Sequence, residues 1–483
     1  MAGRRVLRRW KRTRGPQVES VVQGEAIPRP PGRPLIGNLL EVRPHQAMAD
    51  LSALARQYGP IFALEAPGRV PRLFVSGYDL VDEICDDGRF DKALGPGLAV
   101  LARSPVGHGL FTAETADPEW RRAHNVLLPA FRPQALRGYF PRMLDIAMQL
   151  RLKWERLNPG DTVDVPADMT RLTLDTIALA GFDYRFNSFY RDTPHPFVVA
   201  MLGVLNGAQQ SVRQLPALRR MYWRQERRML VDQVHMARIV ERLIDERRGS
   251  GRLGQVDDLL DRMLVGIDPK SGEGLKDRNI IAQCITFLIA GHETTSGLLS
   301  FAIYALLKHP DVLARAYEEV DRVLGRDASV LPKAAQIGAM RYLTQVLEET
   351  LRLWPTAPAF TRRARQEVML GGRYRVTPEM PLLVMVGMLH RDPKVWGEEP
   401  ERFDPDRFSP ERRRLIAPNA YKPFGSGLRA CIGRLFALQE AALVLAMVLQ
   451  RFELVDFADY TLKTKQTLTI KPDQFYIRVK FRT

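Results

Sequence analysis

The residues with the clearest chemical potential are grouped around one cysteine near the C-terminal end of the chain. Cys431 lies in the segment Phe424-Gly-Ser-Gly-Leu-Arg-Ala-Cys-Ile-Gly433, which precedes an apolar stretch with helical spacing. Glycines allow backbone N–H groups to approach the sulfur, and such contacts favour the thiolate over the thiol. A thiolate held in this way is a candidate ligand for iron. A lone cysteine is also often a small buried apolar residue, so the spacing of the surrounding residues must decide.

A second reactive group interrupts an apolar helical pattern over residues 276–309. Ala290-Gly-His-Glu-Thr-Thr295 places a glycine and four polar residues inside this pattern. Glycine costs a helix interior about 1 kcal/mol relative to alanine, and threonine can bond to the carbonyl four residues earlier and bend the helix. Both effects would leave a groove. The alternative is that the threonine hydroxyls only satisfy their own backbone. The candidates for moving protons are Thr294 and Glu293, and those for leaving room beside them are Ala290 and Gly291.

The apolar spacing predicts a mainly α protein with a small β-rich region. Helical patterns also cover residues 46–58 and 343–353 and dominate from residue 117 onward. The pattern over 276–309 predicts a helix roughly 50 Å long, which is the width of a whole domain. Strand patterns form a hairpin over 61–66 and 72–76 and recur later in the chain, at 368–370, 373–376, 382–386, 464–470 and 474–481.

Charge is concentrated at the N-terminus. The 483-residue chain has a formal net charge of +16, and residues 1–14 carry seven arginines and lysines with no acid. We expect residues 1–27 to form a basic, disordered tail that ends in a proline-rich connector, and residues 28–483 to form one folded domain. Contact of the tail with anionic lipid or an acidic partner is the alternative. No nucleic-acid-binding signature accompanies the basic residues, so we expect no nucleic-acid partner.

Cysteine usage and hydropathy indicate the compartment. The three cysteines, Cys85, Cys284 and Cys431, have no C-x-x-C spacing, so they suggest neither a disulfide framework nor a zinc site. The sequence shows no apolar stretch of about 18 residues and no signal peptide. We therefore expect a cytoplasmic protein, with peripheral membrane contact as a possibility.

The pattern Phe-Gly-x-Gly-x-Arg-x-Cys-x-Gly, combined with Ala290-Gly-His-Glu-Thr-Thr295, resembles the cytochrome P450 family of haem-thiolate monooxygenases. The resemblance implies the P450 fold and a haem b cofactor with Cys431 as the axial iron ligand. It also implies catalytic roles for Thr294 and Glu293, O2 as a substrate, and electrons that come ultimately from NAD(P)H through a flavin or iron–sulfur partner. It is closest to the haem domains of bacterial fatty-acid hydroxylases that are fused to a diflavin reductase, as four segments indicate: residues 168–177, 184–191, 287–297 and 353–360.

The resemblance also assigns residues that would hold the haem. Trp120 and His124, four residues apart on one helical face, and Arg429 would donate to the haem propionates, with His390 as a further donor. Many family members carry arginine where this chain has His124. Phe424 would pack beside the sulfur and tune the reduction potential.

Three further residues resemble the Glu-Arg-Arg network of the family. Glu349 and Arg352 are three residues apart on an apolar helical pattern, and Arg407 lies in Phe403-Asp-Pro-Asp-Arg-Phe408. The same Glu–Arg spacing occurs elsewhere in the chain, where an ordinary surface pair is the simpler interpretation. The network would fix the segment that leads to the cysteine loop.

Substrate contacts follow from the same resemblance. Phe111 matches an aromatic residue above the haem, Ala357 matches a small residue of the pocket, and Arg69 matches a cation that meets a fatty-acid carboxylate. Leu73 replaces the tyrosine that usually assists this cation. We therefore expect subterminal hydroxylation of long-chain fatty acids, with another small, apolar, lipophilic substrate as the alternative.

Electron supply is the remaining question. The chain ends at Thr483, just after the last strand pattern, so we expect no reductase domain within it. It would be a stand-alone enzyme that needs a separate redox partner, or a fragment of a fused enzyme. A basic face would suit an acidic partner, although ordinary surface charge explains it equally well, and its residues are Arg121, Arg122, Lys422 and Arg434. The rival functions are a peroxide-driven peroxygenase and a haem-binding sensor.

Overall fold

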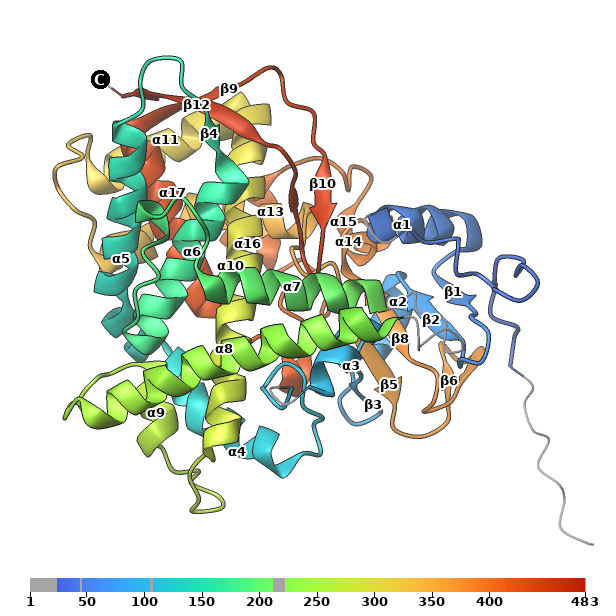
Figure 1. Ribbon diagram of the computed structural model, residues 1–483. Coiled ribbons are helices and arrows are strands. Elements are labelled where there is room, and N and C mark those ends of the chain that lie inside the picture. Colours follow the sequence, from blue (N-terminus) through green and yellow to red (C-terminus); the bar gives the residue numbers. More distant parts are fainter. Residues whose placement is uncertain (1–23, 44–45, 105–106, 212–221, 483) are drawn as a thin grey trace, which may run out of the picture.

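The structure, a computed structural model, describes residues 24–43, 46–104, 107–211 and 222–482. Helices make up most of the molecule and a smaller β region lies to one side, which confirms the expected fold class (Figure 1). The expected tail falls largely on residues 1–23, outside the described part. Residues 24–27, which we assigned to the tail, already contact the β region. The Glu25 N–H donates to the Arg373 carbonyl (2.8 Å), and Ile27 packs on the apolar side of the sheet.

A five-stranded sheet forms the main part of the β region. Its strand order is β1-β2-β8-β5-β3, and only the β2–β8 pair is parallel. The predicted hairpin is present, with β1 and β2 paired from Ile61↔Val75 to Leu64↔Arg72. A short hairpin, β6–β7, lies beside this sheet. The strand bounds are β1 Ile61–Leu64, β2 Arg72–Val75, β3 Phe90–Lys92, β5 Ala359–Ala364, β6 Val368–Leu370, β7 Tyr374–Val376 and β8 Leu382–Met385.

The C-terminal strands form two smaller sheets. One has the order β4-β12-β9, and the other is the β10–β11 hairpin. The strand pattern over 464–470 predicted one strand, but the chain reverses within it because the Thr467 N–H donates to the Thr469 carbonyl (2.9 Å). The strand bounds are β4 Val163–Asp164, β9 Phe452–Asp456, β10 Thr464–Gln466, β11 Ile470–Pro472 and β12 Tyr476–Phe481.

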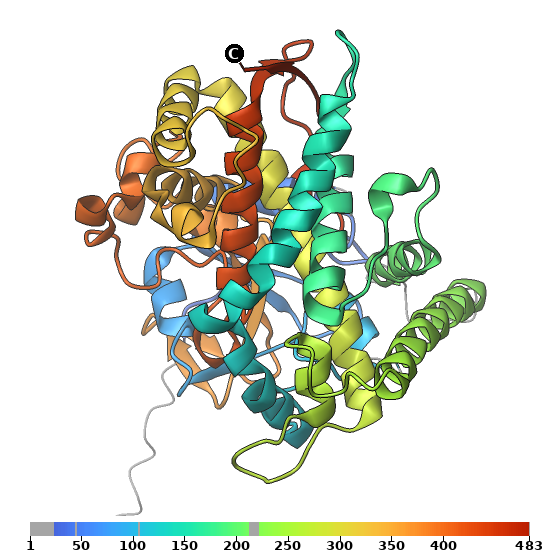
Figure 2. The ribbon, with the colours of Figure 1, turned by 90° about the vertical axis from the view of Figure 1, so that its left-hand side faces the viewer.

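The helices surround one long central helix, α10, which spans 32 residues and therefore about 48 Å. Its bounds agree with the sequence expectation to within one residue at each end. Helix α6 packs along α10, and α17 lies beside α5 (Figure 2). The helix bounds are α1 Ala47–Tyr58, α2 Tyr78–Ile84, α3 Pro96–Ala102, α4 Pro118–Leu127, α5 Pro133–Glu155, α6 Val165–Phe182, α7 Pro196–Ser211, α8 Trp223–Gly249, α9 Leu259–Val265, α10 Asp277–Lys308, α11 Pro310–Leu324, α12 Ala334–Ala339, α13 Arg341–Leu353, α14 Val386–Leu389, α15 Pro393–Trp396, α16 Pro410–Arg413 and α17 Arg434–Arg451.

Within the described residues, no helix combines the length and the apolar character that crossing a bilayer requires.

Candidate active site

The loop before α17 holds Cys431 in a conformation that its glycines permit. The Cys431 N–H donates to the Phe424 carbonyl (2.8 Å), which closes the loop on itself. Gly427 has a φ of +63°, and a Cβ at this position would collide with the carboxylate of Asp87. The same carboxylate accepts a hydrogen bond from the Leu428 N–H (2.8 Å). The loop is thus fixed both by its own backbone and by a residue far away in the sequence.

The thiol at the end of this loop is accessible. Cys431 is exposed, whereas Cys85 and Cys284 are buried. Desolvation by the surrounding protein raises the pKa of the Cys431 thiol, and the Gly433 N–H and the charge of Arg434 oppose that shift. A group that covers the sulfur and carries positive charge would therefore favour the thiolate.

An aromatic contact connects the cysteine loop to α10. Gly433 packs against the ring of Phe131, because a Cβ on Gly433 would lie 3.9 Å from that ring. Phe131 ends the 3-10 helix Leu128–Phe131, and its ring centroid lies 5.6 Å from that of Phe287 on α10. Phe287 precedes Ala290 by about one helical turn. The loop and the middle of α10 therefore lie on either side of the same aromatic contact.

Residues 110–113 form a second connection between the two elements. Arg429 donates to the Leu110 carbonyl (2.9 Å), and the Leu110 N–H donates to the side chain of Gln283 on α10 (2.8 Å). Phe111 lies in this segment and is 39% exposed. Phe111 and Arg429 therefore both lie close to α10, as the sequence analysis expected of site residues.

The middle of α10 presents Ala290 and Thr294 together. The Thr294 hydroxyl donates to the Ala290 carbonyl (2.8 Å), as the sequence predicted, and the helix stays continuous. Ala290 is exposed and Thr294 is partly exposed, although most of α10 around them is buried. Gly291 packs against α6. A Cβ on Gly291 would lie 2.9 Å from Cγ1 of Ile177, so glycine here allows α6 to pack closely, and its expected role beside a ligand stays a prediction.

Glu293 faces β11 from the buried side of α10. Its carboxylate accepts a hydrogen bond from the Thr469 hydroxyl (3.0 Å), and Nζ of Lys471 lies 3.4 Å away. Burial alone would raise the pKa of Glu293, but the hydrogen bond with His292 and the charge of Lys471 lower it below its usual range. Glu293 is therefore an anion at neutral pH, which suits a relay better than a store of protons.

His292 is a member of this group that sequence analysis did not single out. Its Nδ1 lies 2.6 Å from the Leu288 carbonyl and so carries a hydrogen. Its Nε2 lies 3.3 Å from the Glu293 carboxylate. The only sequence signal was a histidine inside an otherwise apolar helix.

Partly buried cations gather beside Trp120. Burial lowers the pKa of Lys92 to about 7, and Arg429 adds to this shift. Burial likewise lowers the pKa of Arg429 to about 10 and, together with Arg121 and Arg429, lowers the pKa of His124. The guanidinium of Arg429 lies 4.2 Å from the centre of the Trp120 ring, and His124 stacks on that ring at 5.1 Å. Lys92 was missed from the sequence because β5 pairs with β3 to place it here.

These cations fit the propionates of a haem. Lys92 donates to the Phe111 carbonyl, and both Arg429 and the Trp120 indole donate to the Leu110 carbonyl (2.9 and 3.2 Å). The donor groups of Lys92, Arg429 and Trp120 thus bond to backbone carbonyls here, and the propionate carboxylates of a haem could accept from the same groups. Burial is the main cause of the lowered pKa values, and an anionic group beside these side chains would favour their charged forms. The accessible thiol, the apolar face of Ala290 and the cation cluster together suit a flat apolar group with acidic substituents.

His390 is not available as a propionate donor. Its Nδ1 donates to the Arg352 carbonyl (3.0 Å), and its Nε2 accepts the Lys422 N–H (2.8 Å). Burial lowers its pKa to about 3, so the ring stays neutral. This histidine instead connects α13 to the segment that leads into the cysteine loop.

Glu349, Arg352 and Arg407 form a buried network. Arg352 donates to both carboxylate oxygens of Glu349 (2.6 and 2.7 Å), and neither side chain is exposed. Nε of Arg407 lies 3.7 Å from Glu349. The remaining N–H groups of Arg352 donate to three backbone carbonyls, those of His390, Pro400 and Arg402. All five guanidinium donors of Arg352 are therefore used, and the predicted contact is present.

The expected substrate residues lie on different elements. Arg69 is exposed in the β1–β2 turn, and Ala357 is exposed just before β5. Leu73, at the position of the missing tyrosine, is buried in the core of the sheet, so no neighbouring hydroxyl replaces it on β2.

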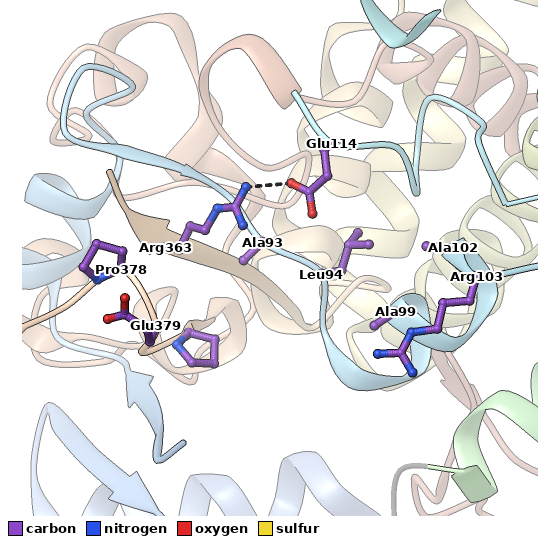
Figure 3. Close-up of a pocket in the computed structure, with 10 residues that line it drawn as sticks. Ala93, Leu94, Ala99, Ala102, Arg103, Glu114, Arg363, Pro378 and Glu379 are labelled. Atoms are coloured by element: carbon purple, nitrogen blue, oxygen red, sulfur yellow. Dashed lines mark hydrogen bonds and ion pairs between the residues drawn. The ribbon is translucent and has the colours of Figure 1, made fainter. Parts of the chain in front are cut away.

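A separate hollow of about 480 Å³ lies between α3 and the sheet (Figure 3). Arg363 and Glu114 form an ion pair at its edge (2.8 Å), with Arg103 across from them. It contains none of the expected site residues, and it is distinct from the cysteine site.

Comparison with known proteins agrees with this site. Residues 27–479 match the Cytochrome P450 family. A bifunctional cytochrome P450/NADPH–P450 reductase of Bacillus cereus is 49% identical over 455 residues, which are 94% of this chain and 42% of the relative. A second bifunctional enzyme, from Bacillus subtilis, is 50% identical over 460 residues (95% and 43%). A self-sufficient cytochrome P450 monooxygenase of Aspergillus niger is 43% identical over 461 residues (95% and 43%).

The chain spans less than half the length of these relatives, and the part it spans is their cytochrome P450 portion. The match covers the cysteine loop, α10 and the buried Glu349–Arg352 network alike. The chain therefore belongs to the cytochrome P450 family.

Proposed function

We propose that this chain is a haem-thiolate monooxygenase domain that inserts one oxygen atom of O2 into C–H bonds of long-chain fatty acids. The observation that carries the proposal is the convergence of an accessible cysteine, a cation cluster and the exposed Ala290–Thr294 stretch of α10. Haem, the cofactor of this family, would supply the oxygen-activating chemistry when bound. Cys431 would hold its iron, and Lys92, Arg429 and His124 would hold its propionates.

Thr294 and Glu293 divide the proton handling between them. Reduction of O2 consumes protons, and an open water channel would let them arrive uncontrolled. The Thr294 hydroxyl donates to the Ala290 carbonyl and can accept a further hydrogen bond on its exposed side. The anionic Glu293, paired with His292 and Lys471, can take up a proton and pass it on after a rotation of its side chain. The resting position of Glu293, turned toward β11, keeps this charge away from an apolar substrate.

Replacing Thr294 with alanine is expected to divert electrons into hydrogen peroxide. The variant removes a methyl group and the hydroxyl that donates to the Ala290 carbonyl. Product formed per NADPH consumed should fall several-fold, and peroxide should rise by the matching amount. The control is Thr295→Ala, because Thr295 is buried on the other side of the helix. Equal coupling in the two variants would show that the hydroxyl has no part in proton handling.

Arg69, Phe111 and Ala357 support the fatty-acid assignment. Arg69 offers an exposed cation on the β1–β2 turn, Phe111 is a partly exposed aromatic ring, and Ala357 is small and exposed. A cation at a distance from an apolar site suits a substrate with one charged end and a long apolar chain. Another lipophilic substrate would need no such cation.

A matched series of fatty acids and fatty alcohols tests this assignment. We expect both classes to shift the haem spin state and the acids to bind more tightly. Arg69→Ala should weaken acid binding about two- to fivefold, the range of one exposed ion pair, and leave alcohol binding unchanged. Product analysis with a surrogate reductase would then locate the hydroxyl group. Equal binding of acids and alcohols by the wild-type protein would favour a neutral lipophilic substrate instead.

Electron supply is the second part of the proposal. We infer that electrons reach the domain from NADPH through a flavin reductase, as the reductase portions in the names of the relatives suggest. A separate partner could dock on the basic residues next to the cysteine loop. Of these, Arg434 lies 3.9 Å from Glu348 and remains 46% exposed at its side chain, and Arg122 pairs with Glu273. We also propose that the protein is cytoplasmic, where NADPH is available to a reductase.

The structure offers no specific support for a peroxide-driven enzyme. Glu293 and Thr294 are both in place, and a reaction that begins from peroxide has no use for a proton relay of this kind.

A further inference from the structure

Helices α7 and α8 form one face of the molecule. They run antiparallel to each other and lie on the surface in both views (Figures 1 and 2). Glycines allow their close contact, because a Cβ on Gly207 would lie 3.2 Å from the sulfur of Met229. The inner side of α8 is buried through Gln233, Met236 and Val240. The outer side therefore has no neighbour within the described chain.

The outer side of the first half of α8 has an unusual composition. Between residues 223 and 240, every exposed side chain is apolar, arginine or histidine. The apolar ones are large, and Trp223 and Val231 are 52% and 59% exposed. The full set is Trp223, Arg224, Arg227, Arg228, Leu230, Val231, Val234, His235 and Arg238.

Cations and apolar groups share one surface here. Trp223, Arg224, Arg227, Arg228 and Val231 line a shallow hollow of about 380 Å³. The guanidinium of Arg224 lies 5.4 Å from the centre of the Trp223 ring. On α7, Val199 and Leu202 are also exposed, 57% and 39%. Exposed apolar residues scattered singly are ordinary, but six of them on two adjacent helices require an explanation.

We propose that this α7–α8 face docks on the surface of an anionic phospholipid bilayer. The apolar side chains would enter the boundary between headgroups and acyl chains, and the arginines would contact the lipid phosphates. The helix would lie in the plane of the membrane with its buried side toward the protein. Arg227 and Arg228 neighbour the apolar Leu230 and Val231, as an interfacial helix requires.

Charge and side-chain type favour a lipid surface over other occupants. A nucleic acid would also attract the arginines, but the exposed set on α8 contains no Asn, Gln, Ser or Thr to read base edges, and its apolar residues equal its arginines in number. A second copy of this chain would bring the same cations together and so would be repelled. A bilayer that carries negative charge satisfies both the apolar and the cationic groups.

The second half of the same helix supplies a natural contrast. Its exposed residues after Val240 include Glu241, Asp245 and Glu246 as well as Arg242 and Arg248. This mixed surface carries three acids against two arginines, and it has no large exposed apolar side chain. The proposed contact therefore ends near the middle of α8.

Vesicle sedimentation tests the proposal on the full chain. The probe is phosphatidylcholine vesicles with and without phosphatidylglycerol, at physiological salt. We expect binding that requires phosphatidylglycerol and weakens as salt rises. Arg227→Gln combined with Arg228→Gln should lower the partition coefficient about 30-fold, since each cation near an anionic surface contributes about fivefold. The control pair is Arg242→Gln with Arg248→Gln, which should leave it within about twofold.

The basic N-terminal residues could bind vesicles independently, so a second measurement locates the contact. In a Trp10→Phe background, brominated phospholipids should quench part of the tryptophan fluorescence, and Trp223→Phe should remove that part. Trp120, Trp154 and Trp396 are buried, and Trp354 is partly buried against Phe301 and Tyr304, so these four should be insensitive. Quenching that persists without Trp223, equal binding to neutral vesicles, or a greater affinity for DNA than for vesicles would each overturn the proposal. None of these outcomes depends on fatty-acid turnover, so the proposed function is tested separately.

Discussion

Replacing Cys431 with serine is expected to abolish monooxygenase activity and the thiolate-type carbon-monoxide difference spectrum. The hydroxyl of serine stays neutral at any pH the protein tolerates, so it cannot supply the electron density that a thiolate gives to iron. The loop should keep its shape. Its hydrogen bonds come from the backbone of Cys431, from Phe424 and from Asp87, none of which the substitution changes.

Two other cysteines provide matched controls for this result. Cys284→Ser and Cys85→Ser make the same change in buried positions, on α10 and next to α2. Either variant can lower stability, because a hydroxyl replaces a buried thiol, but both should retain the spectrum. Far-UV circular dichroism separates loss of the ligand from loss of the fold. A thiolate-type spectrum in folded Cys431→Ser protein would show that another residue binds the iron.

The residues that sequence analysis identified are those whose roles depend on local spacing. Cys431 and its glycines lie within ten positions, Thr294 bonds within its own helix, and Glu349 and Arg352 are one helical turn apart. The long apolar pattern also predicted α10 to within one residue at each end. In each case the interacting residues are close in the sequence, so their spacing alone predicts the contact.

The residues that were missed or misassigned depend on contacts between distant segments. Lys92 enters the cation cluster only because β3 pairs with β5, and strand pairing at a separation of some 270 residues leaves no local signal. Gly291 was expected beside a ligand, and its close packing against Ile177 on α6 had no signal in the sequence. His390 resembled a free donor, but both ring nitrogens are occupied by backbone groups. Each of these roles is set by packing, which a single sequence does not report.

The strongest effect on stability is expected at Arg352. Its guanidinium is fully buried with Glu349 and bonds to carbonyls of the 390–402 segment. Arg352→Leu would leave the buried Glu349 carboxylate with only the Asp404 N–H and the more distant Arg407, and it would leave three carbonyls without their guanidinium donors. Loss of one partner of a buried pair typically costs about 3–5 kcal/mol. Lysine is a weak substitute, because its ammonium has three donors and lacks the planar fork that fits the carboxylate.

This cost should appear at the cysteine loop as well as in overall stability. The His390 Nδ1–H donates to the Arg352 carbonyl, and the Lys422 N–H, just before the loop, donates to Nε2 of His390. When this connection is lost, Cys431 is no longer held in place, so the haem should leave the protein more readily. Urea unfolding followed by circular dichroism would measure the first effect, and transfer of haem to apomyoglobin would measure the second.

Arg402→Gln is the matched control, because Arg402 and Glu399 have the same three-residue spacing on an exposed surface. Such a pair contributes at most about 1 kcal/mol, so this variant should be close to wild type in both measurements. If Arg352→Leu does not fold, Glu349→Gln offers a milder test, since the amide keeps the shape and loses only the charge. Stability and haem retention equal to those of Arg402→Gln would mean that α13 does not hold the cysteine loop. The two pairs differ in burial, so we expect the same i,i+3 spacing to stabilise the protein strongly at Glu349–Arg352 and only weakly at Glu399–Arg402.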